Sequence, residues 1–160
     1  MKKNTDKPGE IVITRVFDAP RGSVWKAWTE REHLVQWWGQ PKGATMPFSE
    51  LDFRIGGSFR YSIRLPDGTL MWGKSIFREI VEAERLVFDD VFTDEKGNPI
   101  INADTPQMKV SATFEDAGKK TKVTIIHSGI SGDLHSADQY KQGWDQVLDR
   151  LADDLAKTTS

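Results

Sequence analysis

Cysteine is absent from this chain of 160 residues. Disulfide bonds, thiolate nucleophiles and sulfur-ligated metals are therefore excluded, and the absence favours a cytoplasmic protein. Long hydrophobic runs are also missing, because no apolar stretch approaches the ~18 residues that a membrane-spanning helix needs. We therefore expect no membrane insertion.

An excess of charge of one sign is missing too. The chain carries 22 Lys and Arg against 24 Asp and Glu, a net charge of −2 at pH 7. We do not expect nucleic acid as a partner, since binding to phosphates needs clustered basic side chains. Residues 1–9 lack the apolar stretch of a secretory signal, and we interpret them as a disordered leader.

Motifs for metals, cofactors and catalysis are not found either. The three histidines are scattered, without the HxxxH or HxH spacing of a metal site. Gly56-Gly57 is followed by no helix and no Gly-Lys-Ser/Thr, which excludes a phosphate-binding loop. No Ser-His-Asp motif or paired-carboxylate spacing stands out. The sequence thus predicts no metal and no cofactor.

Tryptophan, in contrast, is abundant, with six in the chain. Each indole is large and has an N–H to satisfy, so this number implies a spacious core, a cavity wall or an interface. Which of these applies depends on the fold, and the periodicity of the chain predicts that fold.

Much of the chain alternates between apolar and polar residues with period two, as strands with one dry face do. Residues 59–65 show the pattern clearly, and residues 108–115 and 122–127 repeat it. Four further strands are expected at residues 11–17, 45–55, 69–80 and 85–92, which makes about seven. Turns such as Pro66-Asp67-Gly68 join the strands, so the sheet should be antiparallel.

Three helices are expected. Two short ones follow Pro20, and a capping box of Thr29 and Glu32 should open the second, which ends near Trp38. A long C-terminal helix should begin at a second capping box, Ser136 with Gln139, and run to about Lys157. Its apolar residues recur at helical spacing and form one stripe, made of Tyr140, Trp144, Val147, Leu148, Leu151 and Leu155.

These elements predict an α+β fold, a single domain over residues 10–157 followed by a tail at residues 158–160. Antiparallel strands with one dry face must curl around something, and the C-terminal helix has the matching apolar stripe. A helix laid across a strongly curved sheet rarely fills the concavity. We therefore expect an apolar cavity between sheet and helix.

Several segments resemble a known family. They are FDAPRGSVWKAWTEREHLVQWWG, LDFRIGGSF with the PDG turn after it, the strand that begins Arg85-Leu86-Val87, HSG, and GW on the last helix. Their order and spacing resemble the activator of the heat-shock-90 ATPase, in its C-terminal domain, within the START-like, SRPBCC or birch-pollen-allergen-like superfamily. The resemblance covers residues 10–157 and implies a helix-grip fold. The superfamily includes lipid and hormone binders, aromatase/cyclases and chaperone co-factors, so several functions are implied.

Residues expected at inward or near-inward positions are the candidates for a ligand-binding cavity. Aromatic rings there either stack on a flat ligand or form ordinary core. Gly143 either leaves room for a ligand or permits close approach of the helix to the sheet. Asp90 shares the parity of its inward neighbours and needs a partner such as an arginine or Tyr61. The candidates are Trp38, Phe59, Tyr61, Trp72, Phe88, Met108, His127, Gly143 and Trp144.

His127 is the one candidate for catalysis. It shares strand parity with Val123 and Ile125 and should face inward. An imidazole in such a place either exchanges a proton with a substrate or makes a structural bond to a backbone carbonyl. His33 and His135 are expected to face solvent.

Three functions remain open. The first is the binding of a small hydrophobic or amphipathic molecule in the cavity, by a monomer or a homodimer. The second is an enzyme of cyclase or hydrolase type that acts on such a molecule through His127 together with a carboxylate or Tyr61. The third, which the resemblance implies, is interaction with a chaperone or another protein partner. The missing catalytic motifs favour binding over catalysis.

Overall fold

The computed structural model of the protein describes residues 9–102, 105–130 and 134–159. Apart from Gly9, the expected leader lies outside them. In chain order the elements are β1 (Glu10–Phe17), α1 (Arg21–Thr29), α2 (Arg31–Trp37), β2 (Thr45–Leu51), β3 (Ser58–Arg64), β4 (Leu70–Val81), β5 (Arg85–Phe92), β6 (Met108–Ala117), β7 (Lys120–Ser128) and α3 (Leu134–Thr159).

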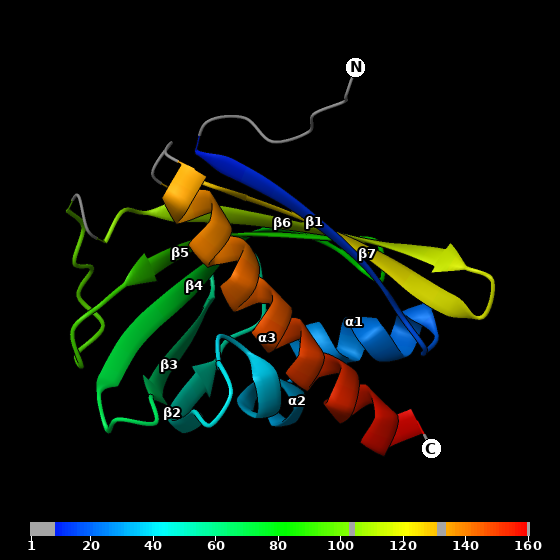
Figure 1. The fold of residues 1–160 in the computed structure, drawn as a ribbon, viewed down its shortest axis with the longest axis horizontal. Coiled ribbons are helices and arrows are strands. Elements are labelled where there is room, and N and C mark those ends of the chain that lie inside the picture. Colours follow the sequence, from blue (N-terminus) through cyan, green and yellow to red (C-terminus); the bar gives the residue numbers. More distant parts are fainter. Residues whose placement is uncertain (1–8, 103–104, 131–133, 160) are drawn as a thin grey trace.

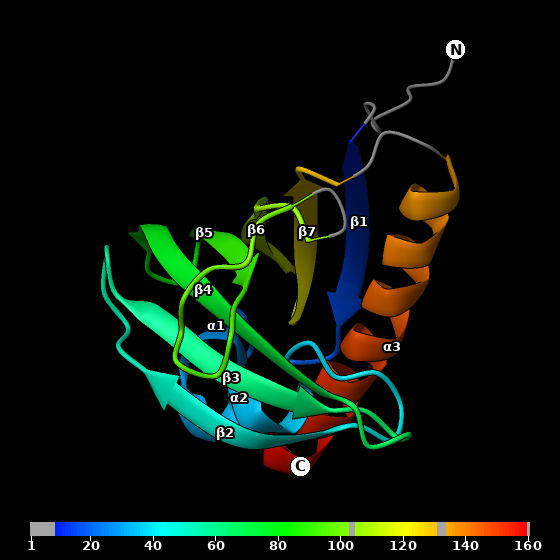
Figure 2. The same ribbon diagram turned by 90° about the vertical axis from the view of Figure 1, so that its left-hand side faces the viewer.

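The strands form one sheet of seven in the order β1-β7-β6-β5-β4-β3-β2, and every neighbouring pair is antiparallel. The sheet curls around α3, with α1 and α2 beneath one end of it (Figures 1 and 2). The predicted α+β helix-grip fold is confirmed, because strands with one apolar face can bury that face only by curving over the helix.

Helix α3 docks through the predicted stripe, and Leu148 and Leu151 are completely buried in it. Its main contacts are with α2, α1 and β1. The helix therefore rests on one edge of the sheet and on the two short helices. Strands β3, β4 and β5 curve away from it on the other side (Figure 2). This off-centre position leaves space between the helix and those strands.

Five of the six tryptophans gather under the sheet. Trp28 stacks on Trp144 with 6.3 Å between ring centroids, and it meets Trp37 and Trp38 edge-on. Trp25 joins the group through Phe114, which both it and Trp28 contact. Edge-to-face and offset-stacked pairs are the favoured arrangements of aromatic rings. The tryptophans thus form most of the core at this end of the domain, with Trp38 and Trp144 at its boundary.

The helix ends differ from the expected ones. Glu30 precedes α2 without any side-chain capping bond, and the Thr29 hydroxyl instead donates to the Trp25 carbonyl, so the first capping box is wrong. The second is wrong as well, because α3 already begins at Leu134 and Ser136 lies inside it. The helix also continues to Thr159, beyond the expected end. Local capping patterns are weak because tertiary contacts decide where a packed helix starts.

His33 does not face solvent as expected. Its side chain is 19% exposed, and Nδ1 lies 2.9 Å from Oδ2 of the buried Asp154. This bond joins α2 to α3, whose docking brings together two residues that are far apart in the chain. The side chain of His135 lies outside the described set. No helix among the described residues is long and apolar enough to cross a membrane.

Candidate functional site

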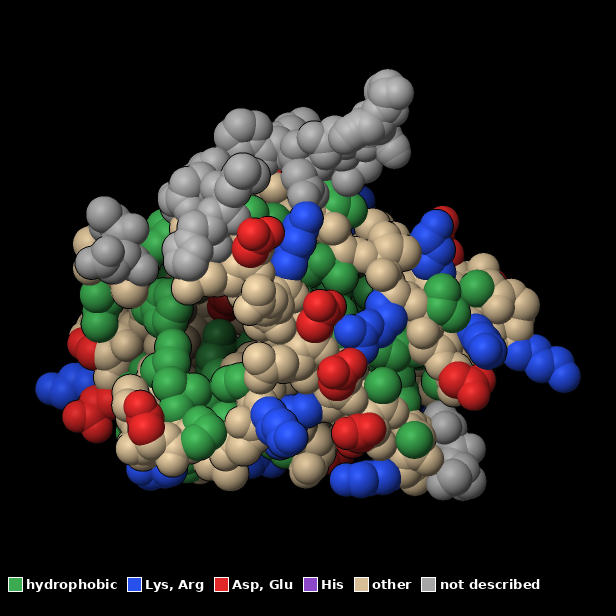
Figure 3. Space-filling model, viewed as in Figure 1, with side chains coloured by type: hydrophobic (Ala, Val, Ile, Leu, Met, Phe, Trp, Pro, Cys, Tyr) green, Lys and Arg blue, Asp and Glu red, His purple; other side chains and the backbone are tan. Residues whose placement is uncertain are grey.

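A cavity of about 430 Å³ lies between α3 and the strands that curve away from it. Figure 3 shows it as a hollow beside α3 with hydrophobic side chains on its walls. Seven of the nine candidate residues line it, Trp72 only at its edge; the other six lie on four different elements and the segment after α2: Trp38, Tyr61, Met108, His127, Gly143 and Trp144. The sheet contributes most of the wall and α3 closes one side.

Gly143 opens the helix side of the cavity. A Cβ atom built at this position would meet no other atom within 4 Å. The absence of a side chain therefore does not serve a close approach of the helix to the sheet, which was one of the two expected explanations. It leaves open space at the cavity wall, which Gly143 and Trp144 both line. A glycine inside a helix costs about 1 kcal/mol relative to alanine, so this space comes at a cost in stability.

A carboxylate, Asp90 on β5, lies on the sheet side of the cavity. Its Oδ1 accepts hydrogen bonds from the Tyr61 hydroxyl over 3.1 Å and from the Ser75 hydroxyl over 3.2 Å. Burial raises the pKa of Asp90 to about 6, although both hydroxyls favour the charged form. Burial, and then the charge of Asp90, raise the pKa of Tyr61 well above its ordinary value. The cavity thus holds an acceptor that is ionised at neutral pH.

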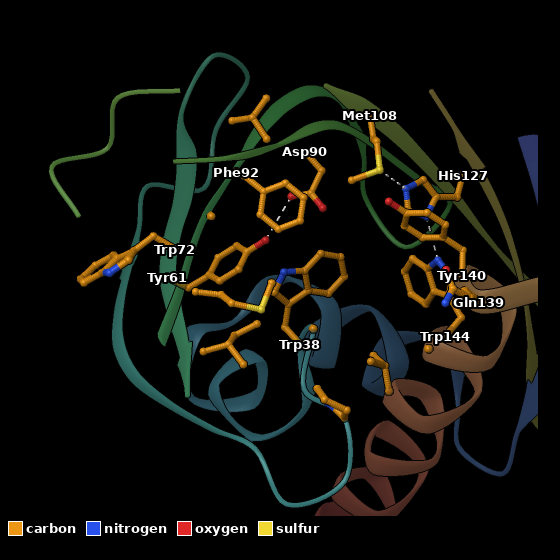
Figure 4. A pocket seen from close by; sticks show the side chains of 18 residues that line it. Trp38, Tyr61, Trp72, Asp90, Phe92, Met108, His127, Gln139, Tyr140 and Trp144 are labelled. Atoms are coloured by element: carbon orange, nitrogen blue, oxygen red, sulfur yellow. Dashed lines mark hydrogen bonds between the residues drawn. The ribbon is translucent and has the colours of Figure 1, made fainter. Parts of the chain in front are cut away.

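Gly73 holds Tyr61 in place. The two residues are opposite each other on β4 and β3, and a Cβ atom at Gly73 would lie 2.7 Å from Cζ of the tyrosine ring. A real side chain there would have to push the ring away. The phenol therefore lies flat across the glycine, and this position directs its hydroxyl toward Asp90 (Figure 4).

His127 lies on the other side of the cavity, against α3 (Figure 4). Its Nδ1 accepts a hydrogen bond from the Trp144 indole N–H over 2.9 Å, and its Nε2 is 3.2 Å from the sulfur of Met108. Because Nδ1 is an acceptor, the ring proton is on Nε2. The Tyr140 ring packs edge-on against the imidazole. The expected inward orientation is confirmed, with an indole and a thioether in place of a backbone carbonyl.

This environment does not suit an acid–base catalyst. Burial lowers the pKa of His127 to about 4, so the ring is neutral at physiological pH. A general base works best with a pKa near the working pH and with a free nitrogen directed at the substrate. Both nitrogens of His127 are engaged by protein groups. The geometry therefore indicates a wall residue of the cavity.

Trp38 forms part of the floor between these two polar groups. Its ring meets the rings of Phe88 and Trp144 edge-on. The indole is 5% exposed, and its Nε1 makes no well-aligned hydrogen bond among the described residues, although it lies near enough to Tyr61 to oppose the rise in the pKa of that phenol. A buried donor without a well-aligned partner is unusual in a native protein.

The sequence matches one family over most of its length. The family described as "Activator of Hsp90 ATPase homolog 1-like protein" matches residues 18–156. The chain belongs to this family. The family lies within the START-like (SRPBCC) superfamily, so the predicted resemblance is confirmed.

Solved structures from several bacteria share the fold. A crystal structure of a Nitrosomonas europaea protein has a TM-score of 0.81 at 22% identity, covering 96% of this chain and 98% of its own. A solution structure from Staphylococcus epidermidis has a TM-score of 0.80 at 26% identity, with 96% and 93% covered. The AHSA1 protein of Silicibacter pomeroyi has a TM-score of 0.76 at 18% identity, with 93% and 99% covered. Among curated proteins, none matches this chain significantly.

Three of the nine candidates lie elsewhere than expected. Phe59 and Phe88 face inward but lie behind the cavity, where they enclose a gap of only about 10 Å³ with other core residues. Trp72 touches the cavity only at its edge, and its indole points away from the centre (Figure 4). The ring packs on Phe48 of β2, on the outer face of the sheet. The inward position expected for Trp72 is therefore wrong.

The error at Trp72 hides two residues of the site, Gly73, which lines the cavity, and Ser75, which donates to Asp90. In β4 the residues that face inward are Gly73, Ser75 and Phe77. Trp72 and the residues two and four positions after it face the other side of the sheet. Hydrophobicity alone favours the opposite assignment, because a tryptophan outweighs a glycine. The regular alternation of β3, which assigns Tyr61 to the inward face, could have corrected the error. Gly73 lies directly opposite Tyr61 in the sheet, and cross-strand partners share a face. Tyr140 and Phe92 also line the cavity. The sequence pattern placed them in the C-terminal helix and in the strand over residues 85–92, but did not identify them as cavity residues.

Metal ligands do not gather in this site. Within residues 9–102, 105–130 and 134–159, no group of three or more His, Cys, Asp or Glu side chains could hold a metal ion. The polar side chains that line the cavity include the Asp90 carboxylate, the Gln139 amide, the hydroxyls of Tyr61 and Tyr140, and the neutral His127 imidazole. Such a set can orient a bound molecule by hydrogen bonds.

Proposed function

We propose that the protein binds a small hydrophobic or amphipathic molecule in the cavity between the sheet and α3. The observation that carries the proposal is the cavity of about 430 Å³, with open space in front of Gly143. This volume lies within the range of about 300–1,000 Å³ that is usual for small-molecule sites. Membership of a START-like family is consistent with the proposal, since that superfamily includes lipid and hormone binders as well as proteins of other functions.

The walls favour an apolar guest. Trp38, Met108 and Trp144 contribute large apolar surfaces, and burial of such surface stabilises a complex by roughly 25 cal/mol per Å². Flat rings on the walls suit a flat or ring-shaped molecule, which can stack on an indole. The few polar groups, chiefly Asp90 and Tyr61, would orient the guest.

A ligand panel tests the proposal. Fatty acids, sterols and polycyclic aromatic compounds are added singly, and tryptophan fluorescence and the melting temperature are measured. A ligand that binds only the folded state raises the melting temperature by mass action, and one that reaches Trp38 or Trp144 changes their emission. Native mass spectrometry of the freshly purified protein shows whether a molecule is retained. If no compound shifts either signal and none is retained, the proposal is wrong.

Two glycines make a matched pair of variants for this test. Gly143 and Gly22 both lie in helices, and neither would bring a Cβ atom within 4 Å of another atom. Only Gly143 lines the cavity. Gly143→Leu should therefore abolish binding of a panel ligand, whereas Gly22→Leu, on the exposed surface of α1, should leave its affinity unchanged. Both changes raise helix propensity by a similar amount, so lost binding in Gly143→Leu reports the filled cavity.

The family name supports a second candidate, interaction with a chaperone of the heat-shock-90 class. Its test is direct. The purified protein is mixed with such a chaperone, and complex formation and ATP hydrolysis are measured with and without a panel ligand. Stimulated hydrolysis that Gly143→Leu leaves intact would favour this candidate over binding in the cavity.

A further inference from the structure

We infer that the molecule bound in this cavity carries a protonated amine on its hydrophobic body, and that the ammonium group docks on the Asp90 carboxylate beside Tyr61 and Phe92. This inference rests on the proposed function and narrows it to one ligand class. It comes from the charge balance of the cavity.

Asp90 has no cationic partner among the described residues. Its two hydrogen bonds come from the neutral hydroxyls of Tyr61 and Ser75, and both go to Oδ1. Across the described residues, no lysine or arginine forms an ion pair with it. A carboxylate inside a protein is normally paired with a cation. The neighbouring Asp89 shows the difference, since it points to the other face of the sheet and pairs with Arg78 over 2.7 Å.

The surroundings of Asp90 favour a cation. The rings of Tyr61 and Phe92 lie beside the carboxylate in the cavity (Figure 4). Aromatic faces attract ammonium groups, and this attraction strengthens when water is excluded. An ammonium group at Asp90 would therefore lie against a carboxylate in a pocket whose walls are largely aromatic. The apolar body would extend toward Trp38 and Trp144.

The same charge disfavours anionic ligands. The field of Asp90 reaches across the cavity to Tyr140 on α3, where it adds to burial in raising the pKa of that phenol. A second carboxylate in the cavity would be repelled by Asp90 and would find no basic side chain there, because the lining contains neither lysine nor arginine. Fatty acids, which are carboxylates at neutral pH, thus fit the cavity in shape and not in charge.

The pH dependence follows from the groups around Asp90. The titratable side chains facing it are Tyr61 from β3, Tyr140 from α3 and His127 from β7. Both tyrosines are neutral at pH 7.5, and His127, with a pKa of about 4, is still largely neutral at pH 5. Asp90, with a pKa of about 6, is mostly ionised at pH 7.5 and mostly protonated at pH 5. Amine binding should therefore weaken between these two pH values.

Three probes with one aromatic body test the inference. They are 2-naphthylmethylamine, 2-naphthalenemethanol and 2-naphthoate, which are cationic, neutral and anionic at pH 7.5. Dissociation constants are measured by calorimetry for the wild-type protein, Asp90→Asn and the control Asp89→Asn. We expect the amine to bind the wild type about ten- to a hundredfold more tightly than the alcohol, as for a hydrogen bond between charged groups. The naphthoate should bind most weakly.

The amine preference should disappear in Asp90→Asn, persist in Asp89→Asn, and shrink in the wild type at pH 5. The last measurement needs no variant, so it stands even if Asp90→Asn folds poorly. Equal affinities for amine and alcohol, or a preference that survives in Asp90→Asn, would overturn the inference while leaving binding in the cavity intact. If none of the probes binds, the amine inference is wrong, and the wider ligand panel decides separately whether the cavity binds anything.

Discussion

The indole N–H of Trp144 donates a hydrogen bond to Nδ1 of His127 over 2.9 Å, and this contact ties helix α3 to the last strand of the sheet at the cavity wall. It fixes the imidazole as the tautomer with its proton on Nε2. A hydrogen bond donated to a neutral nitrogen opposes protonation of that nitrogen. The bond therefore acts together with burial, which lowers the pKa of His127 to about 4.

The Trp144→Phe variant should raise the pKa of His127, because it removes the donor and admits water beside the ring. NMR titration of the imidazole measures the pKa, and its nitrogen shifts report the tautomer. The variant Trp25→Phe removes an indole that touches Phe53 and Phe114, away from His127, and should leave the titration unchanged. An identical His127 titration in the wild type and Trp144→Phe would show that the indole has no influence on it.

Asp90 and His127 should affect the pH dependence of stability in opposite directions. The pKa of Asp90 is about 6 in the folded protein against an ordinary 3.8, so between these values the folded state holds a proton that the unfolded chain has released. Its contribution to the free energy of unfolding therefore decreases as the pH rises from about 4 to 6. The pKa of His127 is about 4 against 6.5, so its contribution decreases as the pH falls from 6.5 to 4.

Variants that remove one titrating group at a time distinguish the contributions of Asp90 and His127 to the pH dependence of stability. Relative to the wild type, Asp90→Asn should lose stability more steeply on acidification from pH 6 to 4.5, by up to about 1.4 kcal/mol per pH unit. His127→Gln should lose stability less steeply than the wild type on the same acidification, also by up to about 1.4 kcal/mol per pH unit. Urea denaturation at four pH values in this window gives the free energies of unfolding. Parallel curves for all three proteins would mean that neither pKa is shifted by the fold.

Gly73→Ala should destabilise the protein by about 1–3 kcal/mol, the usual cost of overpacking. The added methyl group would lie 2.7 Å from the Tyr61 ring, which would have to leave its position and its bond to Asp90. Denaturation experiments measure the loss in the wild type and in a Tyr61→Ala background. The cost should nearly vanish where the ring is absent, and an equal cost in both backgrounds would point to strand propensity instead of the ring.

Leu148→Ala should lower the free energy of unfolding by about 2–5 kcal/mol. The leucine is completely buried in the stripe of α3 that docks under the sheet, so its truncation leaves a cavity. Gln142→Ala, at an exposed position of the same helix, should change stability by less than about 0.5 kcal/mol. A loss of that small size at Leu148 would mean that α3 does not dock as described.

Strand parity explains how much of the site the sequence could predict. Tyr61, Met108 and His127 were assigned inward because their strands alternate regularly, and side chains in a strand alternate between its two faces. The inward position of Asp90 followed from the same rule, but only the structure decided between an arginine and Tyr61 as its partner. The rule fails for Trp72, because the larger residues of β4 lie on the outer face. Which face of β4 turns inward depends on its pairing with β3, a relationship between two strands.

By itself, the sequence determined the α+β helix-grip fold, because periodicity two and periodicity 3.6 are properties of local backbone geometry. Only the tertiary structure decided that α3 rests on β1, α1 and α2, and so leaves a cavity in front of Gly143. It also decided that Asp90 meets two hydroxyls and, within the part of the chain that the structure describes, no cation, and that His33 reaches Asp154 instead of solvent. These features depend on contacts between residues distant in the chain, and local sequence patterns carry no information about such distances.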